Sequence, residues 1–105
     1  FPATGKYEII WNANGATSSQ SQSKYWSTTM RTTVNNSTFN LCAYSYGNLE
    51  GDGYFTNAIA SVLFDVTDTT THKIKFGIET EAASTMLAGS GANISHVVFR
   101  RIGDT

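Results

Sequence analysis

Residues 72–79 read His-Lys-Ile-Lys-Phe-Gly-Ile-Glu, and this stretch indicates the class of the fold. Apolar and polar side chains alternate along it, so an extended strand would bury one face and leave the other in water. Two more strand-length segments, Ala58–Val66 and Ser95–Ile102, lie on either side of it in the chain. Together these segments predict a β-sheet with one wet face.

The rest of the chain is typical of further strands separated by polar turns. Strands are predicted at 6–12, 25–34 and 38–46, with a short one at 86–87, and loops at 14–23, 47–53 and 81–91. Residues 25–34 and 38–46 are expected to pair as a hairpin across Asn35-Asn36-Ser37. No stretch of ten or more residues carries the apolar stripe of a helix. The spacing of strands and turns predicts an all-β fold, an antiparallel jelly-roll sandwich.

The alternation also assigns the interior of this sandwich. A slip of one residue would turn every interior side chain outward, so the register is strongly specified. The predicted core consists of Ile9, Trp11, Val62, Phe64, Val66, Ile74, Phe76, Ile78, Val97 and Phe99. Cys42 is the only cysteine; it is interpreted as a small buried apolar residue, and no intrachain disulfide is possible.

Length and charge restrict the function classes. The 105 residues have room for one domain, so residues 1–105 are predicted to form a single β-sandwich domain. Only 14% of the residues are charged and the formal net charge is -1, which gives no electrostatic reason to expect nucleic acid or an anionic membrane as partner. No segment approaches the ~20 apolar residues of a membrane span. Low charge and abundant Ser, Thr and Asn favour an extracellular or virion surface.

A second set of apolar residues falls on the strand faces opposite the predicted core. A small domain buries a low fraction of its surface, and a three-fold assembly would cover these second faces. The basic pair Arg100-Arg101 must turn one side chain inward, which indicates a salt bridge or a subunit contact. We therefore expect a homotrimer whose interface includes Ile10, Leu63, Val98, Arg100 and Ile102.

Residues that could carry catalysis or bind a metal are few. His72 and His96 are far apart, and no Cys/His spacing suits zinc. Glu50 and Asp52 lie in a Gly-rich loop but lack the ligand ladder of a calcium loop. A glycosidase needs two carboxylates across a cleft, and Glu50, Asp52 or Glu79 could supply them. We predict no metal, no cofactor and no catalytic residue, and keep this enzyme as an alternative.

Aromatic side chains beside the predicted loops are the main candidates for ligand binding. Such rings can stack on sugars or anchor a partner protein. The predicted ligand-binding residues are Tyr25, Trp26, Tyr46 and Tyr54.

Both ends of the chain resemble known β domains. Residues 1–9, Phe-Pro-Ala-Thr-Gly-Lys-Tyr-Glu-Ile, resemble the third-strand entry of trimeric jelly rolls of the complement-head and tumour-necrosis-factor type. Residues 97–104, Val-Val-Phe-Arg-Arg-Ile-Gly-Asp, resemble the closing strand of that group, which runs through the trimer core. The opening pattern, residues 58–76 and the ending Phe-x-Arg-Ile-Gly-Asp-Thr together are similar to C-terminal domains of phage virion proteins.

The resemblance implies a non-enzymatic virion surface protein, a trimeric tail-fibre or spike tip that adheres to the host. Its expected partners are two further copies, other virion proteins and a glycan on the host surface. The alternatives are a capsid decoration (cement) protein and a polysaccharide-degrading enzyme. Two strands that precede the opening turn in the family are expected upstream, so this chain would be the C-terminal part of a longer polypeptide.

Overall fold

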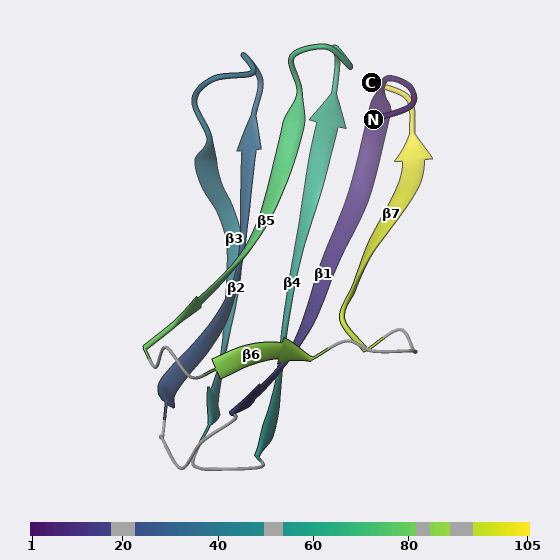
Figure 1. Ribbon diagram of the computed structural model, residues 1–105. Helices are drawn as coiled ribbons and strands as arrows, with labels where there is room; N and C mark the ends of the chain where they lie inside the picture. Colours follow the sequence, from purple (N-terminus) through teal and green to yellow (C-terminus); the bar gives the residue numbers. More distant parts are fainter. Residues whose placement is uncertain (18–22, 50–53, 82–84, 89–93) are drawn as a thin grey trace.

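The computed structural model describes residues 1–17, 23–49, 54–81, 85–88 and 94–105. Over these residues the chain is all-β, with no helix, which confirms the predicted class (Figure 1). No described helix is therefore long or apolar enough to cross a membrane. The strands are β1 (Gly5–Thr17), β2 (Ser23–Thr33), β3 (Asn40–Leu49), β4 (Phe55–Val66), β5 (Lys73–Thr80), β6 (Thr85–Ala88) and β7 (His96–Gly103).

The strands form two antiparallel sheets that pack as a sandwich. In sheet A, β1 pairs with β4 along one edge, and its other edge pairs with β7 over residues 6–12 and with β6 over residues 14–17. In sheet B, β2 lies between β3 and β5. The predicted hairpin is confirmed as the antiparallel pair β2–β3.

The core lies between the sheets, on the face that alternation assigns. Along β1 the odd-numbered residues are buried, and they pair with even-numbered residues of β4, as in Ile9 opposite Val62. From sheet B, Trp26 and Met30 of β2 enter the same core. Its buried apolar residues are Tyr7, Ile9, Trp11, Ala13, Trp26, Met30, Leu49, Ala58, Ala60 and Val66.

Most of the predicted core residues lie in or against this core. Three of them are buried and six are half-buried against it; the half-buried ones are Val62, Phe64, Ile74, Phe76, Ile78 and Val97. The interior position predicted for Phe99 is only half right: its side chain shares the inner face with Ile9 but is 48% exposed.

Two tryptophans join the sheets. A Cβ at Gly15 of β1 would lie 2.6 Å from the indole ring of Trp26, so the ring packs directly on bare backbone. In the opposite direction, the Trp11 Nε1–H of β1 donates to the carbonyl of Gly77 on β5 at 3.1 Å. Trp11 also contacts Phe76, with ring centroids 5.9 Å apart. These contacts fix the separation of the layers.

Side-chain caps shape two of the turns. Asn35 Oδ1 accepts hydrogen bonds from the amides of Ser37 and Thr38, and Asn36 has φ 60°, a conformation that Asn tolerates better than most residues. Asp68 accepts hydrogen bonds from the amide and hydroxyl of Thr70 before β5. The first of these turns lies where the sequence predicts it, at Asn35-Asn36-Ser37.

Two predicted loop boundaries are wrong. β1 continues through Asn14 to Thr17 and β3 continues to Leu49, although both segments were expected to be loop. The Asn14 amide donates to the Ser95 hydroxyl, and residues 14–17 pair with β6 while residues 14–16 also pair with β4. Leu49 is buried in the core. Partners that are distant in sequence therefore override the polar, Gly-containing local composition.

Replacing Gly15 with alanine should destabilise the fold by about 1–3 kcal/mol, because the new methyl group would collide with the Trp26 ring. Gly103→Ala is the matched control, since a Cβ there has nothing within 4 Å and should change stability by less than ~0.5 kcal/mol. Urea unfolding of both variants measures the difference. Equal stabilities would contradict the packing of Trp26 on β1.

The turn at Asp68 should make stability depend on pH. Hydrogen bonds from Thr70 lower the pKa of Asp68 below its ordinary value. The stabilisation is therefore fully present above the unfolded-state pKa and is lost as the pH falls through the lowered folded-state pKa. Between pH 5 and pH 2 the melting temperature of Asp68→Asn and of Thr70→Val should fall less than that of the unchanged chain. If the melting temperatures of the unchanged chain and both variants fell equally with pH, the hydrogen bonds between Thr70 and Asp68 would not be the cause of the pH dependence.

Candidate functional site

The outer face of sheet B carries a pair of exposed aromatic rings. Tyr44 and Tyr46 of β3 point away from the core, 65% of Tyr46 is exposed, and the two ring centroids lie 5.2 Å apart. Across the sheet, Tyr46 is in register with Ser27 and Glu79, and Tyr44 with Thr29 and Gly77. We call the surface formed by Arg31, Tyr44, Tyr46, Gly77 and Glu79, with the buried Ser27 and Thr29 beneath it, the tyrosine face.

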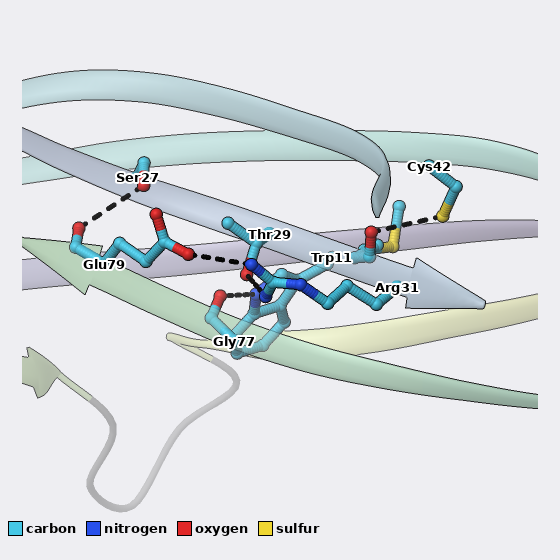
Figure 2. Close-up of polar contacts among 8 residues, drawn as sticks. Trp11, Ser27, Thr29, Arg31, Cys42, Gly77 and Glu79 are labelled. Atoms are coloured by element: carbon cyan, nitrogen blue, oxygen red, sulfur yellow. Dashed lines mark hydrogen bonds and ion pairs between the residues drawn. The ribbon is translucent and has the colours of Figure 1, made fainter. Parts of the chain in front are cut away.

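Polar groups lie beside the rings in a fixed arrangement. Arg31 Nη2 forms an ion pair with Glu79 Oε1 at 3.0 Å, and Arg31 Nη1 donates to Thr29 Oγ1 at 3.2 Å. The Ser27 hydroxyl donates to the backbone carbonyl of Glu79. Figure 2 shows these contacts in line across β2 and β5. The guanidinium is thereby oriented by two partners, while about half of the Glu79 side chain remains exposed.

Gly77 leaves the middle of the tyrosine face without a protruding side chain. A Cβ at this position would lie 2.7 Å from Thr29 Oγ1 and would push against the residue that orients Arg31. Gly77 also holds its strand to the core through the hydrogen bond from Trp11 on the other side (Figure 2). The result is a shallow surface with aromatic rings on one side and an ion pair on the other.

Such a surface suits a flat polar ligand with one apolar face. Tyrosine rings pack against C–H groups, and the Arg31–Glu79 pair offers donors and acceptors for hydroxyl groups. A sugar ring has both features.

The predicted ligand-binding residues are only partly brought together. Tyr46 belongs to the tyrosine face, Tyr25 is 39% exposed on β2, and Tyr54 is exposed just before β4. The exposure expected for Trp26 is wrong: its side chain is 1% exposed and lies in the core. The prediction omitted Tyr44, although its position two residues before Tyr46 on a strand places both on one face.

Cys42 is exposed rather than buried, which corrects its interpretation as a core residue. Its thiol lies 3.2 Å from the backbone carbonyl of Met30 (Figure 2). The β2–β3 register shifts between Met30 and Arg31, so the strict alternation that predicts burial does not hold at this point.

The outer face of sheet A is apolar in its middle. Leu63 is 71% exposed and Ile59 is exposed on β4, while Ile10 and Val98 are half-buried on β1 and β7. Ile10 is directly opposite Val98 in the register. We call the surface formed by Ile10, Ile59, Leu63 and Val98 the apolar face. It is unusual because outward positions of a monomeric sandwich are mostly polar.

The predicted interface residues gather on or beside the apolar face. Arg100 lies next to it, with its guanidinium 2.9 Å from Glu8 on the neighbouring strand. Ile102 is exposed where the β1–β7 register shifts. Arg101, opposite the buried Tyr7 in the register, pairs with Asp104, but its side chain remains 45% exposed, so the expected turn into the interior is not observed. Ile59 was missed, although it is four residues from Leu63 on one strand and therefore on the same face.

The structure places only one of the three carboxylates considered for an enzyme. Glu50 and Asp52 lie outside the described residues, and Glu79 is paired with Arg31. In the part of the chain that the structure describes, no group of three or more His, Cys, Asp or Glu side chains could hold a metal ion. His72 is buried between the hydroxyls of Thr67 and Thr71.

Comparison with known proteins identifies no relative: no family model, no curated protein and no solved structure matches this chain. Its function must therefore be inferred from its own residues and their geometry.

Proposed function

We propose that this chain is a non-enzymatic adhesive module that assembles as a homotrimer and displays the tyrosine face to a glycan. The observation that carries the proposal is the chemical difference between the two outer faces of the sandwich. Sheet A presents the exposed Leu63 and Ile59 without a cover among the described residues, whereas sheet B presents aromatic rings beside an ion pair. An apolar face suits assembly, and an aromatic-polar face suits recognition.

The proposal extends to the topology and the location. Strand β1 pairs with β4 and β7 in one sheet, while β2 pairs with β3 and β5 in the other, so the chain crosses repeatedly between the layers. This crossing order supports a jelly-roll assignment. Together with the resemblance of both chain ends to phage virion domains, it supports a tail-fibre or spike tip on the virion surface, attached to other virion proteins.

Trimer formation would cover the apolar face. Three copies related by a rotation can each contribute Leu63 and its neighbours to a shared, dry interface. The Glu8–Arg100 pair beside it would lie at the polar rim of such an interface.

A capsid decoration protein is the second candidate, and the same apolar face favours it. In that case Leu63 and Ile59 would seat the chain on the shell rather than on two further copies. A chain that remains monomeric in solution but binds empty capsids through this face would support decoration over the trimeric tip.

Tyr46→Ala should weaken binding to host envelope polysaccharide at least about tenfold, or ~1.4 kcal/mol, because it removes the stacking ring. Tyr46→Phe is the matched control and should retain most of the binding, since it keeps the ring and loses only the hydroxyl. Melting temperatures should stay unchanged because the side chain is exposed. Release of oligosaccharides that is abolished by Glu79→Gln would instead identify a polysaccharide-degrading enzyme.

Leu63→Lys should convert the trimer to monomers, because a lysine would place a charge in each of three apolar contacts. Leu41→Lys makes the same change at an exposed site on sheet B and should leave the trimer intact. Multi-angle light scattering at micromolar concentration measures the outcome against the chain mass of 11.4 kDa. A monomeric unchanged chain would rule out the trimer.

A further inference from the structure

One flank of the sandwich is open between β5 and β7. A cavity of about 680 Å³ lies there, lined by Phe1, Tyr7, Ile74 and Phe99 and by the cationic side chains of Lys73 and Arg101. On the opposite flank β3 and β4 approach closely, since a Cβ at Gly47 would meet the Thr56 hydroxyl. The core is therefore covered on one side and accessible on the other.

The exposure of Phe99 shows how incompletely this flank is covered. Phe99 is opposite Ile9 in the register and shares its inner face, yet Ile9 is fully buried and Phe99 is 48% exposed. Phe1 and Phe76 contact the Phe99 ring, at 5.7 and 5.9 Å between centroids, without burying it. An inward-facing aromatic side chain that remains half exposed marks a missing neighbour on the β7 side.

The backbone of β7 indicates what that neighbour is. β7 pairs with β1 along one edge, and no other described strand pairs with it. An edge strand presents a row of N–H and C=O groups that another extended chain can pair with. A strand added there would place every second side chain over Phe99 and the cavity.

We propose that β7 accepts an extended strand from a partner polypeptide, apolar at alternate positions and acidic at the positions between them. The charge follows from Arg100, whose side chain is 66% exposed and has Glu8 on one side only. An added strand would extend this cross-strand row, and a carboxylate next to Arg100 would be attractive. A second copy of β7 is disfavoured, because antiparallel pairing of two such strands would bring the Arg100-Arg101 pairs close together.

The direct test is a titration of the ¹⁵N-labelled 105-residue chain with a synthetic peptide, acetyl-Thr-Val-Glu-Val-Glu-Val-Thr-amide. Binding should slow hydrogen exchange of the amides in residues 97–103 and shift their resonances. The control peptide has Lys in place of both Glu residues and keeps the apolar positions. It should bind about tenfold more weakly at low salt, because its charges oppose Arg100.

A charge-reversed variant keeps the test independent of peptide design. Arg100→Glu lies at an exposed site, and it should invert the preference so that the Lys peptide binds more tightly than the Glu peptide. The proposal is overturned if neither peptide protects β7, if the preference does not change with residue 100, or if the perturbed amides lie around Ile10, Ile59 and Leu63 instead of along β7. It is also overturned if two copies of the chain pair with each other through the backbone edge of β7.

Discussion

The contact between the Trp26 ring and the bare backbone at Gly15 is the constraint on which the rest of the structure depends. It brings the middle strand of sheet B against the middle strand of sheet A at a distance that leaves no room for a side chain at Gly15. The hydrogen bond from Trp11 to Gly77 joins the layers in the reverse direction. Because each sheet contributes one indole to the other, the alternation of every paired strand is fixed relative to the core.

The two outer faces follow from that fixed alternation. With Trp26 and Met30 directed inward, Thr29 and Arg31 must face outward, between Tyr44 on one side and Glu79 on the other. In sheet A the buried odd-numbered residues of β1 leave the even-numbered ones outside, in register with Leu63 and Val98. A single core packing therefore places the tyrosine face, proposed for recognition, and the apolar face, proposed for assembly, on opposite sides of a thin module.

The sequence alone predicts the inner face of a strand correctly where apolar and polar residues alternate strictly. It fails where both faces of a strand carry apolar or aromatic residues. The segments around Ile9, Val66 and Ile74 identified their strands and inner faces correctly. The exposure predicted for Trp26 was wrong because its position beside a polar loop suggested that the side chain is exposed. Its burial depends on the contact with Gly15, which is distant in sequence. The sequence also could not predict the open flank beside Phe99, because alternation indicates which way a side chain points but not whether another strand covers it.

The most direct test of which face forms the interface is a measurement of intermolecular nuclear Overhauser effects. The sample is an assembly mixed from labelled and unlabelled chains. In a trimer assembled through the apolar face, contacts between copies are expected from the methyl groups of Ile10, Leu63 and Val98, and none from the rings of Tyr44 and Tyr46. Intermolecular contacts from the tyrosine rings, or the absence of such contacts from Leu63 in a trimer, would show that the apolar face is not the interface.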